Sequence, residues 1–542
     1  MRDGSTVKFS FQEQPEWPGQ AWLAQCGVSG VVIVRHGKKV ECHEQWFCEA
    51  VWDGEFAHGE FDQTDIVFGS GGRIRGGEAI FVASGSTCDR LHSISSGGFS
   101  WISNSLPCLL TGIDAEVEPA FSHYPELLGS IVEGIENCAT GLPTTAGLAR
   151  LTYFHNLRWD GKGLHVAQKP FADRSFASYD EYLDFLRRCM KAIALNASDQ
   201  RRKVPYRLLS TLSSGYDSSM VSVLAKEVGC IDAITITSSR AGTPDSGDAL
   251  AATLGLDLKR VHREDWRKRH LPEALFLAAD SKGPDCYFAG AEPDLAGRLV
   301  LTGFPGDHWR KNPIDISPQI LRGDQAGLSL TEYRLHAGFI HCSVPYFGVR
   351  AAADLKRISN SLELKPWDVP GWSKPICRRL VEEAGVARGA FGATKQAASV
   401  LMPGTKSFLT DDSVDDFRRW IGEAKMRSFD RLLLRYRFEL SVLAGKLLAG
   451  IEQSARWLMP RLRDVPVLWR LSRSRAVAGA LRVRESHSRV HLRRSVFPWA
   501  VAVAQSRYRG ARVTEGDAVQ SSDARDAEVA GPTVVNDARR ER

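Results

Sequence analysis

The chain has 542 residues, of which 43% are hydrophobic and 25% charged, with 48 Gly, 24 Pro and 11 Cys. This composition excludes collagen-like, disulfide-scaffold and wholly disordered proteins, and the length suits about two to four domains. The net charge of +6 hides an uneven distribution, because residues 1–417 carry −7, residues 418–512 carry +16 and residues 513–542 carry −3. A mildly acidic body is therefore followed by one strongly basic, Arg-rich segment.

The sequence also predicts a soluble protein of the cytoplasm. No apolar stretch approaches the roughly 18 residues that a membrane-spanning helix needs, and the first residues have no apolar signal-peptide core. The cysteines are odd in number and scattered without C-x-x-C spacing, which is typical of reduced thiols.

Residues 21–112 have the pattern of a β-rich domain. Short apolar runs such as GVSGVVIV, AIFVA and FSWIS are separated by Gly, Ser and Asp clusters, which favours antiparallel strands. Residues 179–197 instead carry apolar side chains at helical spacing. We therefore expect a first domain over residues 1–175.

From residue 204 the pattern changes to alternating strands and helices. Apolar strands are expected at residues 205–212, 231–239 and 258–264, with helices at 218–229 and 246–256. This alternation predicts an α/β domain with a doubly wound parallel sheet over residues 176–417. Beyond it we expect Arg-rich helices over residues 418–512 and a disordered tail over residues 513–542.

The segment between Leu208 and Gly229 is the most informative for chemistry. An apolar strand runs into the sequence SSGYDSS and then directly into a helix. Free backbone N–H groups and the positive end of the helix dipole favour an anion at such a junction. Asp217 would repel phosphate by itself, so its natural role would be to hold Mg²⁺. The alternative is a Ser-rich helix cap with a helix-stabilising Asp in the first turn.

This loop resembles the S-G-G-x-D-S pyrophosphate loop of asparagine synthetase type ATP pyrophosphatases, with Ser214 in place of the first glycine. GRLVLTGFPGDHW, at residues 297–309, is similar to the second nucleotide segment of that family, with Phe304 and His308 replacing two glutamates. The resemblance implies that the cofactors are ATP and Mg²⁺, with Asp217 and Asp307 as metal ligands. It implies nucleotide contacts from Ser213, Ser214, Gly215, Asp217, Ser218, Ser219, Thr237 and Gly303.

Two later segments extend the resemblance. HAGFIHCSVPYFGV is similar to the family's V-E-A-R-V-P-F-L-D, with His341 in place of a catalytic glutamate and Tyr346 in a matching position. SKPICRRL and the residues that follow place Lys374 and Lys395 on the two lysines of the next family segment. The resemblance implies that Lys395 stabilises the transition states and that His341 and Tyr346 line the acceptor side of the catalytic site.

The N-terminal domain resembles a glutaminase without its nucleophile. The family uses a cysteine as its first residue, whereas here Met1 is followed by Arg2, and the matching C-G-V-S-G begins at Cys26. A cysteine whose nitrogen lies in a peptide bond lacks the α-amino base, so Cys26 would require removal of the preceding residues. We therefore expect a degenerate N-terminal-nucleophile-like domain without glutaminase activity.

The leading prediction is an ATP-dependent amide ligase of asparagine synthase type that forms AMP and pyrophosphate. Its partners would be a small-molecule or peptide carboxylate and an amine donor, either ammonia or a substrate amine. The alternative is a non-catalytic ATP-binding pseudoenzyme or scaffold, motivated by the same substitutions. A homodimer is left open.

The basic segment has two readings. Its arginines interleave with aromatic residues, so it could bind nucleic acid, an anionic membrane surface or an acidic partner. We favour helices docked on the acidic body, with the arginines facing solvent. The aromatic residues concerned are Trp457, Trp469, Trp499 and Tyr508.

Overall fold

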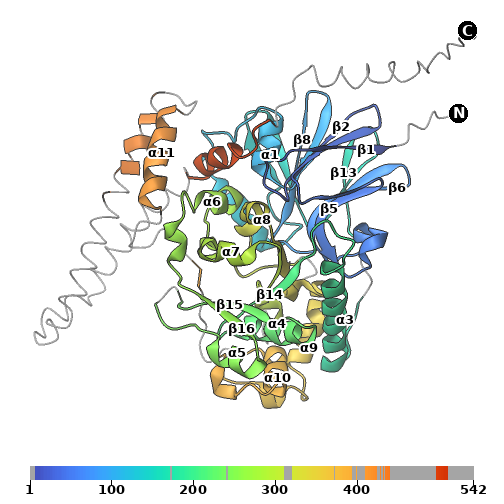
Figure 1. Cartoon of the computed structure of the whole chain (residues 1–542), viewed down its shortest axis with the longest axis vertical. Helices are drawn as coiled ribbons and strands as arrows, with labels where there is room; N and C mark the ends of the chain where they lie inside the picture. The colour runs from blue at the N-terminus through green and yellow to red at the C-terminus, as the bar shows by residue number, and fades with distance from the viewer. Residues whose placement is uncertain are drawn as a thin grey trace, which may run out of the picture.

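The computed structural model describes residues 7–170, 174–239, 242–310, 320–370, 373–392, 398–399, 409–423 and 496–510, with scattered positions between 428 and 443. The fold is mixed α/β, with a β-rich N-terminal region followed by a parallel sheet, which confirms the predicted class at that level (Figure 1). Among the helices in these ranges, none combines the length and apolar character that crossing a bilayer requires.

The N-terminal region consists of two sheets. Apart from the parallel pair of β1 and β3, all of their strand pairings are antiparallel, as predicted. The seven-stranded sheet has the order β1 (Lys8–Glu13), β3 (Val31–His36), β2 (Trp22–Cys26), β9 (Phe99–Ser103), β8 (Arg90–Ser96), β11 (Gly147–Tyr153) and β10 (Gly141–Thr144). The six-stranded sheet has the order β13 (Leu164–Ala167), β12 (Asn156–Trp159), β7 (Glu78–Val82), β6 (Val67–Arg75), β5 (Trp46–Trp52) and β4 (Glu41–His43).

Large apolar side chains from both sheets form one core between them. Trp22 of β2 contacts Phe47 of β5 edge to face, with ring centroids 5.2 Å apart, and stacks on Phe81 of β7 at 6.1 Å. All three side chains are buried, so the alternating pattern of the strands has placed one face of each sheet against the other.

Two short helices lie within this region of the chain, between β9 and β10, and one long helix links the region to the next. They are α1 (Leu106–Gly112), α2 (Tyr124–Gly129) and α3 (Tyr179–Ala197). The long helix has the bounds that its periodicity predicts, because the Ser178 side chain caps it by accepting from the Glu181 amide and its apolar positions fall on one buried face.

A five-stranded parallel sheet forms the second half of the fold. Its order is β16 (Asp257–Val261), β15 (Asp232–Ile236), β14 (Arg207–Thr211), β17 (Arg298–Thr302) and β18 (Ile340–Ser343). The chain moves outward from β14 to β16 and then returns to place β17 on the other side of β14. The winding direction therefore reverses between β14 and β17, and in open α/β sheets ligands bind at the carboxyl ends of strands at such a point.

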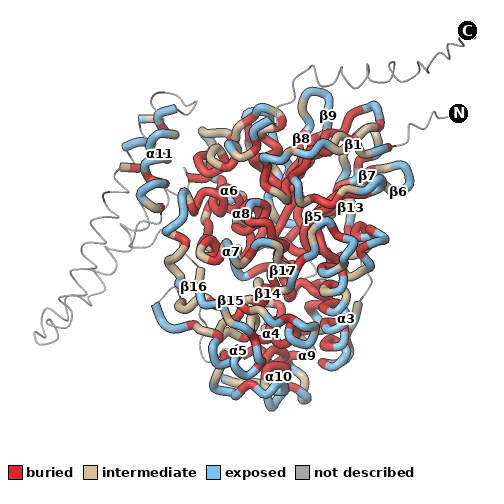
Figure 2. Tube along the Cα trace, viewed as in Figure 1, coloured by how far each residue is buried: buried red, intermediate tan, exposed pale blue. Residues whose placement is uncertain are grey.

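The helices that follow β14 in the chain are mostly short. They are α4 (Tyr216–Glu227), α5 (Asp248–Leu254), α6 (Ala274–Asp280), α7 (Glu292–Leu295), α8 (Leu330–Ala337), α9 (Ala352–Ser359), α10 (Pro375–Glu383) and α11 (Asp411–Glu423). Buried chain is concentrated in the sheets and where they meet, whereas many helices expose one side (Figure 2).

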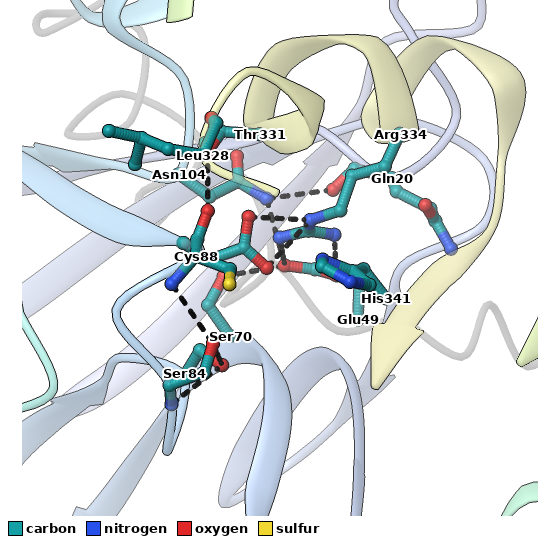
Figure 3. A network of polar contacts seen from close by, with 12 residues as sticks. Gln20, Glu49, Ser70, Ser84, Cys88, Asn104, Leu328, Thr331, Arg334 and His341 are labelled. Atoms are coloured by element: carbon teal, nitrogen blue, oxygen red, sulfur yellow. Dashed lines mark hydrogen bonds and ion pairs between the residues drawn. The ribbon is translucent and has the colours of Figure 1, made fainter. Parts of the chain in front are cut away.

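A buried ionic network joins the two halves. The Arg334 guanidinium of α8 donates to both carboxylate oxygens of Glu49 in β5, at 2.6 and 3.1 Å, and to Asp89 at 3.0 Å (Figure 3). Glu49 also accepts from Ser70 and Asn104. Two carboxylates from the β-rich region thus converge on one cation from the α/β region.

The end of the described chain returns to the body. Residues 496–505 are helical, and the Trp499 indole donates to Asp416 Oδ2 at 2.9 Å while the Tyr508 hydroxyl donates to Glu332 Oε1 at 2.5 Å. Both rings are buried, which agrees for these two residues with the favoured interpretation of helices docked on the body. Trp457, Trp469 and most of the basic segment lie outside the described residues.

Candidate active site

The loop after β14 is held together by its own serines. The Gly215 amide donates to Ser213 Oγ at 3.1 Å, the Ser213 and Ser218 hydroxyls lie 2.8 Å apart, and Ser219 Oγ donates to the Gly215 carbonyl at 2.6 Å. Gly215 precedes α4 in extended conformation, so the first-turn amides of α4 follow directly after the loop. Such amides lack intrahelical acceptors and can bind an anion.

A second loop, after β17, packs directly on Asp217. A Cβ atom added to Gly303 would lie 2.7 Å from Asp217 Cβ, and one added to Gly306 would overlap the Asp217 carboxylate. The next residue, Asp307, pairs with Arg310 at 2.5 Å and accepts from the Gly323 amide at 3.0 Å. The structure thus brings together Asp217, Gly303 and Asp307, which the sequence predicts for one site.

Lys374 completes this cluster. Its ammonium, at the start of α10, donates to Asp217 Oδ1 and to the Gly306 carbonyl, the latter at 2.5 Å, and its side chain is buried. Burial raises the pKa of Asp217 from its ordinary value, and the Lys374 charge opposes that rise. The resemblance matched Lys374 to a family lysine, but its contact with Asp217 appears only in three dimensions.

Asp245 is a residue that sequence reasoning missed. Its Oδ1 accepts from the Ser214 amide at 3.3 Å and from Ser214 Oγ at 2.8 Å, and its own amide donates to the carbonyl of the predicted contact Thr237 at 3.4 Å. It lies in the loop after β15 among Ser, Gly and Thr residues, where no motif marks it. The contact places the carboxyl end of β15 beside the loop after β14.

His341 and Tyr346, predicted for the acceptor side, are buried below these loops. His341 Nε2 lies 2.8 Å from Thr302 Oγ1, whereas its Nδ1 has no hydrogen-bond partner within the described part of the chain. The Tyr346 hydroxyl bonds the Thr87 hydroxyl of the β-rich region. Lys395 lies outside the described residues, although the amide of the nearby Gly392 donates to the Ser214 carbonyl at 2.8 Å.

The carboxylates of Asp217 and Asp307 fit a magnesium ion that is bound together with the phosphates of a nucleotide. Across the described ranges, no group of three or more His, Cys, Asp and Glu side chains could hold a metal, so Asp217 and Asp307 act as a pair at most. Mg²⁺ in nucleotide sites is commonly held by one or two carboxylates, with phosphate and water oxygens as its other ligands. The Lys374 ammonium would then share Asp217 with the ion.

Cys26 does not have the setting of a nucleophile. It is the last residue of β2, is buried, and has its backbone in register between Val32 and Ser100. Burial raises the pKa of its thiol, which disfavours the reactive thiolate. Removing the preceding residues would also remove β1, the edge strand that pairs with β3. All eleven cysteines lie in the described ranges and are free thiols.

Comparison of the sequence with models of known protein families and with curated proteins found no match to either.

The neutral state of His341 leads to a stability prediction. Burial lowers the pKa of His341 from 6.5 to about 4, so between these pH values the unfolded chain binds a proton that the folded chain does not. The contribution of the neutral His341 side chain to the free energy of unfolding is therefore complete above pH 6.5 and is lost as the pH falls toward 4. We expect the free energy of unfolding of the wild type, relative to that of His341→Gln, to fall by about 2–3 kcal/mol from pH 7 to pH 4. Urea titrations of both proteins at several pH values measure this difference, and a pH-independent difference would contradict it.

Proposed function

We propose that the chain is an ATP-dependent amide ligase of asparagine synthase type, with a doubly wound ATP pyrophosphatase domain. The observation that carries the proposal is the meeting of two loops at the reversal between β14 and β17. One loop supplies the amides at the start of α4 and Asp217, and the other supplies Asp307. Lys374 and Arg310 add two positive charges at the same place.

Each element has a task in adenylation. The amides and hydroxyls of residues 213–219 would hold the pyrophosphate group, and Asp217 and Asp307 would hold Mg²⁺, which neutralises phosphate charge. A carboxylate oxygen of the acceptor then attacks the α-phosphorus, and pyrophosphate leaves. The resemblance gives Lys395 the role of stabilising the negative charge that develops on the phosphoryl oxygens, and Lys374 would share that role.

The second half-reaction forms the amide. An amine nitrogen attacks the acyl carbon, loses a proton, and displaces AMP. Because Cys26 is a buried strand residue, the nitrogen would come from ammonia or from an amine of the substrate rather than from glutamine hydrolysis.

Product analysis tests the proposal. With MgATP, ammonium and a panel of small carboxylic acids and peptides, we expect AMP and pyrophosphate, and glutamine should be no better than ammonium as nitrogen donor. Formation of ADP would contradict the proposal. Tight ATP binding without turnover for any acid would favour the non-catalytic scaffold, in which the Lys374–Asp217 ion pair serves structure alone.

A further inference from the structure

A helical stretch after α11 exposes three large apolar side chains. The described positions between 428 and 443 are helical, and the exposed fractions are 67% for Leu432, 62% for Tyr436 and 56% for Leu443. Exposed apolar residues that are scattered singly are normal on a protein surface, whereas several that lie together mark an interaction site. We call these three side chains the apolar stripe.

The apolar stripe occupies one face of the helix. Because successive residues of an α-helix are about 100° apart, its three members fall within about 40° of one another around the axis. Leu434 and Phe438 project from the opposite side, about 140° to 180° away. Phe438 is buried, Leu434 packs against the core, and the Phe438 ring lies 4.5 Å from that of Phe417 in α11. The helix thus has two apolar faces, of which one is packed and the other is exposed.

Contacts with the rest of the chain hold α11 and this helix in place. Arg418 of α11 donates to both carboxylate oxygens of Glu439, at 2.7 and 2.9 Å. The Trp499 ring, from the returning end of the chain, lies 5.6 Å from the Phe417 ring, and its indole donates to Asp416. α11 stands at the margin of the molecule, across from the N-terminal sheets (Figure 1). The apolar stripe is therefore anchored by the opposite face of its own helix and points away from α11.

Positive charge accompanies the apolar stripe. Arg435 is exposed and lies about 60° from Leu432 around the helix axis. Residues 418–512, to which the helix belongs, carry a net charge of +16. Helices that lie in the surface of a bilayer combine an exposed apolar face with flanking Arg or Lys side chains, and Tyr is enriched at that interface. The charge and the apolar stripe together therefore match an anionic membrane surface.

We propose that the apolar stripe docks on an anionic membrane surface, with its helix parallel to the bilayer and the stripe inserted among the headgroups. The net positive charge of residues 418–512 attracts the anionic lipids. Nucleic acid is the less favoured partner, because Trp499 and Tyr508 are buried and the leucines of the stripe offer no stacking surface to a base. The inference does not depend on the ligase function, since the stripe lies outside the loops that follow β14 and β17.

Cosedimentation of the full chain with lipid vesicles tests the proposal. The vesicles contain about equal parts of phosphatidylglycerol and phosphatidylcholine, or phosphatidylcholine alone. The stripe variant replaces all three members of the stripe, by Leu432→Ser, Tyr436→Ser and Leu443→Ser. The matched control replaces three apolar side chains that are exposed on other parts of the fold, by Leu195→Ser, Ile231→Ser and Leu362→Ser. Because all six positions are exposed, both variants should stay folded, which circular dichroism checks.

We expect the wild type to bind the anionic vesicles more tightly than phosphatidylcholine, and to bind them less tightly as salt screens the headgroup charge. The stripe variant should bind the anionic vesicles about 10- to 100-fold more weakly, because its serines gain little by leaving water. Arg435→Gln should weaken binding by about 5-fold. The matched control should bind as the wild type does.

Three results would overturn the proposal directly: no sedimentation of the wild type with anionic vesicles, equal sedimentation of the stripe variant and the wild type, or equal binding to phosphatidylcholine alone. Two other results would overturn it by naming a different partner. Binding to a labelled oligonucleotide but not to vesicles, unchanged in the stripe variant, would assign the arginines to nucleic acid. A wild-type dimer that binds no vesicles and dissociates in the stripe variant would assign the stripe to a second copy of the chain.

Discussion

Replacing Gly306 by Ala should weaken MgATP binding by at least about 10-fold and reduce any adenylation by about 100-fold, while the protein stays folded. The added methyl group would overlap the Asp217 carboxyl carbon. It would therefore displace the Asp217 carboxylate and the Lys374 ammonium, which is bonded to both Asp217 and the Gly306 carbonyl. Gly306 has no positive φ angle, so the substitution acts through this overlap rather than through backbone strain.

A double-mutant cycle identifies the cause. In an Asp217→Ala background the added methyl group has no carboxylate to displace, so Gly306→Ala should cost little more. Gly422→Ala is the matched control, since a Cβ there meets nothing within 4 Å. Normal MgATP affinity in Gly306→Ala, measured by titration, would show that Asp217 does not take part in binding.

Replacing Arg334 by Met should lower the free energy of unfolding by about 3–5 kcal/mol. Arg334 and Glu49 are almost fully buried, and without the guanidinium two carboxylates, Glu49 and Asp89, lose their counter-charge (Figure 3). The exposed pair Arg187 and Glu227, 2.8 Å apart, is the control, and Arg187→Ala should cost less than about 1 kcal/mol.

The pH dependence of this loss gives a second readout. Burial raises the pKa of Glu49, and the Arg334 charge opposes that rise. In Arg334→Met the pKa of Glu49 in the folded protein should therefore rise further, so the variant is most stable when Glu49 is protonated. The difference in free energy of unfolding between the wild type and Arg334→Met should therefore grow from pH 5 to pH 8, as measured by urea titrations. A loss below about 1 kcal/mol at pH 8 would show that the network does not couple the two halves.

Local patterns were sufficient to predict the elements around the loops. The alternation of apolar runs and turns anticipated β14, β15 and β16, and the apolar spacing anticipated α3, because these signals act within a few residues. The parallel pairing of β1 with β3 was not predicted, since it joins segments whose register is set by the folded sheet.

The residues of the candidate active site could be predicted from the sequence only where they belong to a recognisable motif. Asp217, Gly303 and Asp307 lie in two segments with recognisable spacing, and the structure places them together. Asp245 joins the cluster through a contact with Ser214, 31 positions earlier in the chain, which no local pattern specifies. The resemblance singled out Lys374 but not its contact with Asp217. The burial of Trp499 and Tyr508 likewise depends on where the C-terminal helix docks rather than on its Arg-rich composition.

The most direct test of the proposed ligase is carboxylate-dependent exchange of labelled pyrophosphate into ATP, measured on the full chain over a panel of mono- and dicarboxylic acids and peptides. Exchange should require Mg²⁺, depend on at least one acid, and fall by about 100-fold or more in Asp217→Asn. Asp248→Asn, an exposed carboxylate at the start of α5, should exchange normally. Exchange that is equal in Asp217→Asn and the wild type, or absent with every acid, would contradict the proposal.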